Sequence, residues 1–105
     1  MPTHELTELT ALELAEKIGR GECRSEEVVA ACLAKIAALE PEIGAWAHLD
    51  PDYAMEQARR ADRLRGTGQP FGPLHGVPVG VKDIIDTADM PTENGSALFA
   101  GRRPG

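Results

Sequence analysis

The stretch that decides the fold spans residues 72–83 and reads GPLHGVPVGVKD. Three valines alternate in it with smaller or charged residues: Val77, Val79 and Val81. Successive side chains point to opposite faces of a β-strand, so this spacing predicts a strand with the valines on one face. Lys82 then shares the other face with Pro78 and Gly80. Because glycine within a strand often marks the close approach of another group, we expect Lys82 to stand beside open space.

The chain changes character near Gly66. From Gly66 to Gly105 there are eight glycines and five prolines, and helical periodicity disappears. Residues 1–65, in contrast, are rich in charge and carry apolar residues at helical spacing. Glycine and proline are the strongest interruptions of regular structure, so the sequence predicts a helical part followed by a loop-and-strand part.

Three helices are predicted before Gly66. Thr10 with Glu13 has the capping-box pattern of a helix start, and Gly19 is expected to end this first helix. Its predicted apolar stripe consists of Leu12, Ala15 and Ile18. Ser25 is expected to cap the second helix, which has the strongest apolar periodicity in the chain and which Pro41 should stop.

A short strand and the third helix follow. Residues 44–49 alternate in part and predict a strand. Asp50 and Pro51 have the residue types of an N-cap and a first helical position, and Gly66 should end the helix that they start. Glu56 and Arg60 form a favourable pair four residues apart on this helix. The arginines near its end could bind an anion, but a solvated helix face is the better interpretation.

Composition excludes several classes of function. The net charge of −6 and the pI near 5.0 argue against a direct nucleic-acid partner. No apolar run approaches the roughly 20 residues of a membrane span, and the start MPTHE lacks the basic and apolar regions of a secretory signal. Cys23 and Cys32 are then reduced thiols, and we expect a cytoplasmic protein.

The same stretch carries a family resemblance. GPLHGVPVGVKD, followed by IDTADMPT at 85–92 and GS at 95–96, resembles the first characteristic block of the amidase-signature family. The start LTELTALEL, the SEEV helix and the DPDYA helix are also similar to the way in which these enzymes begin. The resemblance implies an α/β fold, an α/β/α sandwich with a mixed β-sheet. Residues 1–105 would be the N-terminal part of a single amidase domain, with outer helices in 1–65 and the first core strand and catalytic-lysine loop in 66–105.

The resemblance also implies a chemistry. The family uses a Ser–cis-Ser–Lys triad, in which the lysine matching Lys82 is the base, a serine beside a cis peptide bond relays the proton, and a second serine attacks the amide. Backbone N–H groups beside the nucleophile stabilise the oxyanion. Ser25 and Ser96 are the only serines of this chain, and neither matches a triad serine. We therefore expect a truncated piece that is inactive alone. Ile84 departs from the asparagine that many relatives carry.

The acidic residues after Lys82 bear on this role: Asp83, Asp86, Asp89 and Glu93. A lysine acts as a base only when its amine is neutral, and carboxylates nearby stabilise the charged form. The catalytic interpretation therefore requires these groups to be turned away or engaged elsewhere. Their spacing does not fit a calcium loop.

No metal or cofactor is predicted. His4, His48 and His75 lack metal-ligand spacing, and His75 is best interpreted as a loop histidine, although it could line the cleft of a full enzyme. The expected partner is a small-molecule amide, and a homo-oligomer stays open. Two alternatives to an amidase remain. One is the glutamine amidotransferase subunit of tRNA-dependent amidation, and the other is a truncated, non-catalytic helical module that binds a partner through helix 25–39 or by strand addition.

Overall fold

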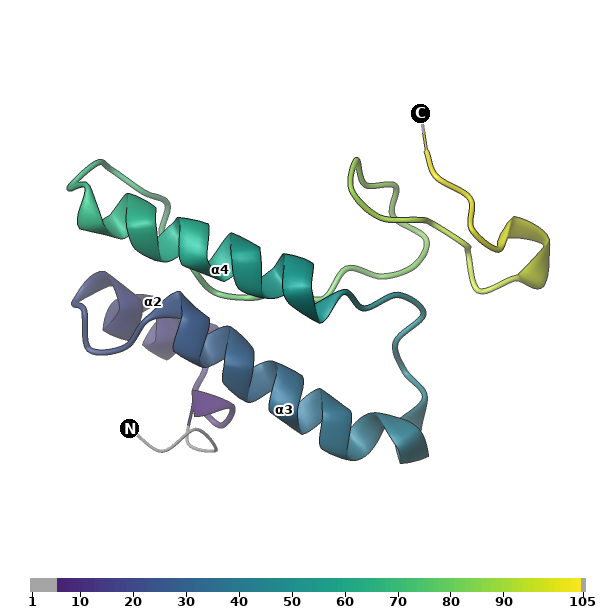
Figure 1. Cartoon of the computed structure of the whole chain (residues 1–105), viewed down its shortest axis with the longest axis horizontal. Helices are drawn as coiled ribbons and strands as arrows, with labels where there is room; N and C mark the ends of the chain where they lie inside the picture. Colours follow the sequence, from purple (N-terminus) through teal and green to yellow (C-terminus); the bar gives the residue numbers. More distant parts are fainter. Residues whose placement is uncertain (1–5, 105) are drawn as a thin grey trace.

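The computed structural model describes residues 6–104 of the chain. The helices are α2 (Ala11–Gly19), α3 (Ser25–Ile43) and α4 (Pro51–Gly66), followed by the short 3-10 helix η1 (Ala97–Phe99). Helices α3 and α4 lie side by side and run in opposite directions, and α2 lies against the first half of α3 (Figure 1). The segment after α4 passes back along the helices and ends beyond the start of α4.

Helix α2 begins and ends as the sequence predicts. The Thr10 hydroxyl accepts the Glu13 N–H at 3.1 Å, and the Glu13 carboxylate accepts the Thr10 N–H at 2.9 Å, which completes the capping box. The predicted apolar stripe is wrong in part, because Leu12 is 68% exposed while Leu14 and Ile18 are buried.

The start of α3 differs from the prediction. Arg24 is the N-cap, and Ser25 is the first residue of the helix rather than its cap. The free N–H groups of Ser25 and Glu26 are bound by the Asp62 carboxylate of α4, at 2.7 and 3.0 Å. The Ser25 hydroxyl instead donates to the Gly76 carbonyl at 2.6 Å. A helix start leaves unpaired N–H groups, and here a side chain from another helix binds two of them.

Substituting Asp62 tests this long-range cap. Asp62→Ala should lower the free energy of unfolding by about 2 kcal/mol, because it leaves two partly buried N–H groups without acceptors. Asp62→Asn keeps one oxygen acceptor and should lose less. Urea titration followed by circular dichroism measures both, and equal stability of Asp62→Ala and the unaltered chain would contradict this role.

Helix α3 also runs further than expected. Pro41 was expected to stop it, but α3 continues through Pro41 to Ile43 and ends at Gly44. Gly44 has a φ of 62°, a left-handed conformation that glycine adopts without strain, and its N–H donates to the Glu40 carbonyl at 2.8 Å. Pro41 lies so near the end that few hydrogen bonds depend on its missing N–H.

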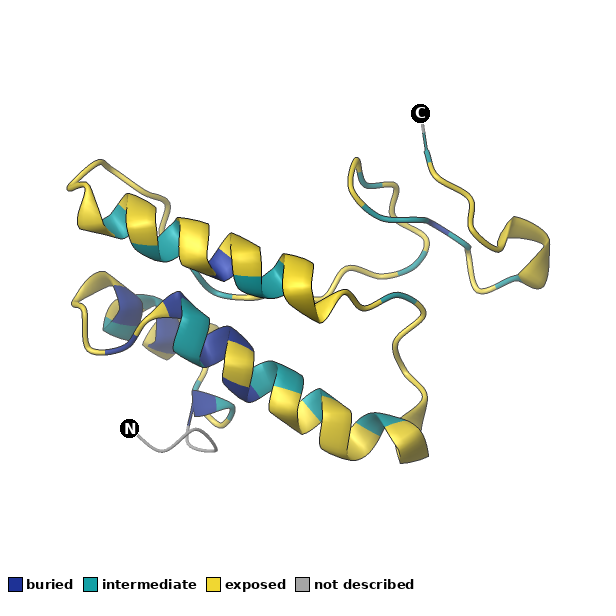
Figure 2. Cartoon of the chain, in the orientation of Figure 1, coloured by how far each residue is buried: buried dark blue, intermediate teal, exposed yellow. Residues whose placement is uncertain are grey.

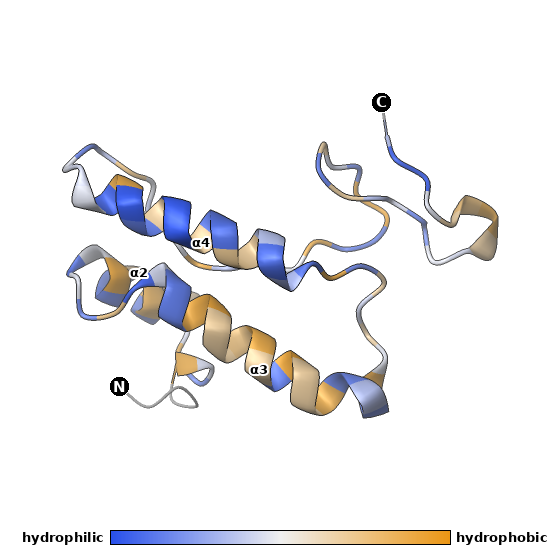
Figure 3. Ribbon diagram, in the orientation of Figure 1, coloured by the Kyte–Doolittle hydropathy of each residue, from blue (hydrophilic) through white to orange (hydrophobic). Residues whose placement is uncertain are grey.

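Helix α4 has the predicted ends. Asp50 is its N-cap and accepts the Tyr53 N–H at 3.0 Å, with Pro51 at the first position and Gly66 at the last. The predicted ion pair is wrong, because Glu56 pairs with Arg63 at 3.2 Å and not with Arg60. Only Ala58 of α4 is buried, in keeping with the polar surface of this helix in Figure 3.

The core lies where α2 meets the first half of α3 (Figure 2). It is formed by side chains that are almost fully buried: Leu6, Leu14, Ile18, Cys23, Val28 and Ala31. Val77 packs against this cluster from the C-terminal segment. The segment that carries Lys82 is thus attached to the helical core five residues before the lysine.

The α/β prediction is wrong for residues 6–104, which contain no strand and therefore no mixed sheet. The segments expected to be strands, 44–49 and 77–81, have no ladder of hydrogen bonds between them. Pro78 has no N–H to donate to such a ladder. The N–H groups of Ala45 and Trp46 are bound instead by the Glu40 carboxylate, at 2.8 and 2.7 Å.

Candidate functional site

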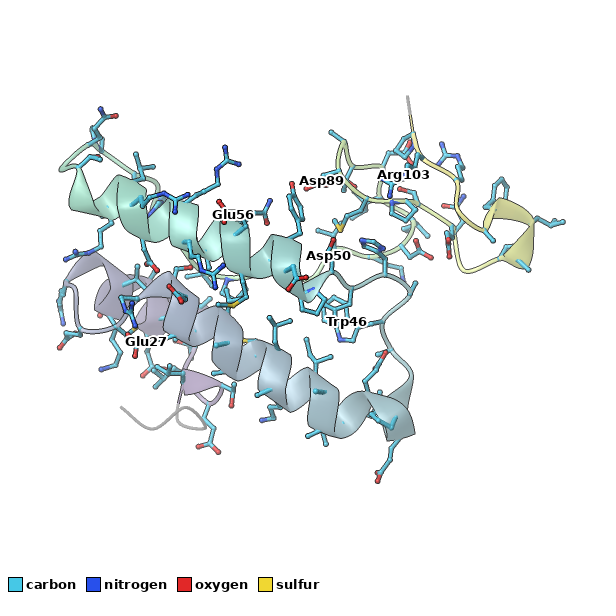
Figure 4. All side chains as sticks on the ribbon, viewed as in Figure 1. Glu27, Trp46, Asp50, Glu56, Asp89 and Arg103 are labelled. Carbon is cyan, nitrogen blue, oxygen red and sulfur yellow. The ribbon has the colours of Figure 1, made fainter. Side chains whose placement is uncertain are left out.

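A cleft of about 530 Å³ lies between the α3–α4 connection and the C-terminal segment. One wall consists of residues 45–48, and the other is formed by residues 79–83 together with side chains between 85 and 91. Figure 4 shows the labelled Trp46 on the α3–α4 connection, on the side of the C-terminal segment. Small-molecule sites in proteins are commonly about 300–1,000 Å³ in volume, so the cleft has the size of a ligand site.

Lys82 lines this cleft and is exposed. The segment before it is extended and unpaired, so its position depends on side-chain packing and turns rather than on a sheet. Within the part of the chain that the structure describes, no hydrogen bond or ion pair engages the Lys82 ammonium group. The side chain is therefore accessible to a molecule that enters the cleft.

The acidic residues that follow Lys82 each have another partner. The Asp83 carboxylate accepts the backbone N–H groups of Glu93 at 2.9 Å and Gly95 at 3.3 Å. Asp86 forms an ion pair with Arg102 at 2.8 Å. The Glu93 carboxylate accepts the Gly101 N–H at 2.6 Å.

Asp89 is engaged from the helical part. The Tyr53 hydroxyl donates to its carboxylate at 3.0 Å, and this hydrogen bond raises the pKa of Tyr53. All four carboxylates thus contribute to the folding of the loop around Lys82 rather than pairing with the lysine.

The Asp86–Arg102 pair gives a pH dependence. The hydrogen bond from Arg102 holds the pKa of Asp86 below its ordinary 3.8. A lowered folded-state pKa adds stability above the unfolded pKa, and this stability is lost as the pH falls through the folded value. Asp86→Asn should therefore unfold at lower urea than the unaltered chain at about pH 6, and the difference should disappear by about pH 2. A difference that stays constant over this range would contradict the ion-pair contribution.

The turn before the valines is fixed to the helices. His75 donates from Nε2 to the Ala61 carbonyl of α4 at 2.8 Å, and Gly76 has a φ of 81°. A Cβ at Gly76 would lie 3.1 Å from the Ser25 Cβ and 3.3 Å from Ile18, so only glycine fits without displacement. His75 therefore anchors this turn and does not line the cleft.

The remaining sequence candidates are placed as follows. His48 lines the cleft, whereas His4 lies outside the described residues. Ser25 and Ser96 do not line the cleft, and the Ser96 side chain caps η1 by accepting the Leu98 N–H at 3.2 Å. Burial raises the pKa of Cys23 and of Cys32, which disfavours reactive thiolates.

Two kinds of feature are absent from residues 6–104. No group of three or more His, Cys, Asp or Glu side chains is placed to hold a metal ion. Over the same described range, no helix is long and apolar enough to span a membrane.

Comparison with known proteins decides the family. The amidase family model matches residues 27–105, which include the whole lysine segment and both walls of the cleft. The chain belongs to the amidase family. This confirms the resemblance that the block around Lys82 indicates.

The curated relatives of this amidase chain carry one name. It is 45% identical over 100 residues to a glutamyl-tRNA(Gln) amidotransferase subunit from Salinispora arenicola, a match that covers 95% of this chain and 20% of the relative. The proteins of the same name from Chloroflexus aggregans and Myxococcus xanthus are 45% and 42% identical, with 95% of this chain covered and 20% and 21% of the relatives. The chain thus spans about a fifth of the length of these relatives. No solved structure matches it.

Sequence reasoning found Lys82 but missed Trp46 and His48 as residues of the same cleft. Nothing in the local pattern around residues 45–48 marks a site, because their proximity to Lys82 depends on contacts between segments about 35 residues apart in the chain. The indole of Trp46, the only tryptophan, was the one signal that could have directed attention to this segment.

Proposed function

We propose that the protein containing this amidase chain hydrolyses a carboxamide to a carboxylic acid and ammonia or an amine, with Lys82 as the base. The observation that carries the proposal is the position of Lys82. It lines a cleft of ligand size without an ion pair in the described part of the chain, while its acidic neighbours are bound elsewhere. A base must be accessible to the group whose proton it takes.

The proposed reaction proceeds through two serines that this chain does not supply at the cleft. The nucleophilic serine oxygen forms a bond to the amide carbon, and its proton passes through the relay serine to the neutral Lys82 amine. The C–N bond then breaks, and the proton returns by the same route to the leaving nitrogen. Water attacks the acyl ester, the ester C–O bond breaks, the acid is released, and the serine recovers its proton. Lys82 ends each half-reaction as it began.

We further propose a division of labour within this part of the amidase domain. Residues 1–65 supply helices that support the cleft from outside, and residues 66–105 supply the loop that carries the lysine. The contacts of Ser25 with Gly76 and of Tyr53 with Asp89 support this division, since each joins the helical part to the lysine loop. Ser25 and Ser96 take part in neither proton relay nor attack, because their hydroxyls are used in folding.

A second candidate is the glutamine amidotransferase of tRNA-dependent amidation. The names of the curated relatives favour it, since all three relatives above are called glutamyl-tRNA(Gln) amidotransferase subunits. In that case the amide would be glutamine, and the ammonia would serve a tRNA-bound substrate in a complex with other subunits. The same lysine and serines would perform both reactions.

Ammonia release distinguishes the candidates. The polypeptide that the gene encodes is incubated with acetamide, benzamide and L-glutamine, and ammonia is measured. Release from the simple amides supports the amidase, and release from glutamine alone supports the amidotransferase. Release from none of them would contradict both and favour the non-catalytic helical module.

A further inference from the structure

The α3–α4 connection is held in place by one carboxylate. Glu40 accepts the N–H groups of Ala45 at 2.8 Å and Trp46 at 2.7 Å through its two oxygens. An anion near a helix C-terminus is disfavoured by the helix dipole, so a carboxylate here needs a compensating interaction. Two hydrogen bonds to an ionised acceptor supply it, because such bonds are stronger than neutral ones. The chain is thereby fixed at the residue that carries the indole.

The indole packs against the lysine segment. A Cβ placed on Gly80 would lie 3.6 Å from Cη2 of Trp46, which is ordinary van der Waals contact. The ring therefore lies next to the backbone two residues before Lys82. Trp46 is 41% exposed and lines the cleft, so the part of the indole that does not contact Gly80 faces the cleft.

The rest of the lining near Lys82 is mainly apolar. The apolar side chains of the opposite wall are Val79, Val81, Ile85, Met90 and Pro91. The Asp83 carboxylate also reaches the lining, but it accepts N–H groups of its own loop. Apolar walls with a few polar groups are typical of sites that orient an apolar ligand by one reactive group.

We infer that Trp46 is a specificity-determining residue that favours amides with a flat or branched apolar substituent over acetamide and over glutamine. The inference rests on the proposed amide hydrolysis. The reactive amide lies towards Lys82, and its substituent packs between the indole and the apolar wall. Glutamine would place an ammonium and a carboxylate against these apolar surfaces, and removing charged groups from water without partners is unfavourable.

The ratio of kcat/KM for benzamide to that for acetamide tests this role in the polypeptide that the gene encodes. An apolar pocket distinguishes substrates that differ by one small apolar group by about 10–200-fold, so the unaltered protein should prefer benzamide by at least about ten-fold. Trp46→Ala should reduce the ratio by about ten-fold or more, and Trp46→Phe should keep most of it. Phe71→Ala is the matched control, because Phe71 is equally exposed but does not line the cleft.

The outcomes separate this inference from the proposed function. An equal loss for benzamide and acetamide in Trp46→Ala would show a merely structural residue and overturn the inference while leaving amide hydrolysis in place. No preference for benzamide in the unaltered protein would overturn it without any variant. Hydrolysis of neither amide by the unaltered protein would overturn the proposed function and this inference with it.

Discussion

Lys82→Ala is expected to lower kcat for amide hydrolysis by about a hundred-fold to ten-thousand-fold, the range that a positioned general base contributes. The side chain lines the cleft and makes no hydrogen bond or ion pair in the part of the chain that the structure describes. Its removal should therefore leave the fold intact, so that the loss of activity reports chemistry. Ammonia release under saturating benzamide measures the effect.

Lys35→Ala is the control for this substitution. Lys35 is an exposed lysine on α3 that does not line the cleft, so the same loss of charge and volume should leave kcat within about two-fold. Circular dichroism of both variants checks that the helices are retained. Loss of activity in both variants alike, or in neither, would remove Lys82 from the role of base.

Ile18→Ala should have the largest effect on stability, a loss of about 2–5 kcal/mol in the free energy of unfolding. Ile18 is 1% exposed and occupies the centre of a core with few large side chains, so little is available to fill the cavity. Its methyl groups also lie against Gly76, which carries the turn before the lysine segment. The loss should therefore loosen both the helices and the Lys82 loop.

Ile43→Ala serves as its matched control, because the same atoms are removed from a side chain that is 63% exposed at the end of α3. Its effect should stay within about 0.5 kcal/mol. Urea unfolding of the two variants gives the comparison. A similar, small change in both would mean that Ile18 is not in a packed core.

The helices could be predicted because their signals are local. The capping box of Thr10 and Glu13 and the Asp50–Pro51 start involve residues within three positions of each other, and both are as expected. The start of α3 could not be predicted in this way, since its N–H groups are bound by Asp62, 36 and 37 residues away. Local propensity correctly indicated that a helix begins near Ser25 but not which side chain stabilises it.

The strands were predicted from alternation, which records only which face a side chain would occupy. A strand also needs a partner with free N–H and C=O groups. In this chain Pro78 lacks the N–H, and Glu40 binds the N–H groups of the segment around Trp46. Alternation without a partner therefore gave an extended segment and no sheet.

The site was predicted in part for a similar reason. Lys82 lies in a contiguous sequence block, which a single stretch of sequence reveals. Trp46 approaches it only after α3 and α4 have folded against each other, and the engagement of Asp89 by Tyr53 likewise depends on packing between distant segments. Sequence identified the reactive group, and the structure supplied its surroundings.

The activity of Lys82→Arg is the most direct test of Lys82 as the base. Arginine keeps the positive charge and the hydrogen-bond donors but stays protonated in proteins, so it cannot accept the serine proton. The account predicts that, in the polypeptide that the gene encodes, ammonia release from benzamide falls as far in Lys82→Arg as in Lys82→Ala. Retention of a substantial part of the unaltered rate by Lys82→Arg would show that the cleft needs a charge at this position and not a base.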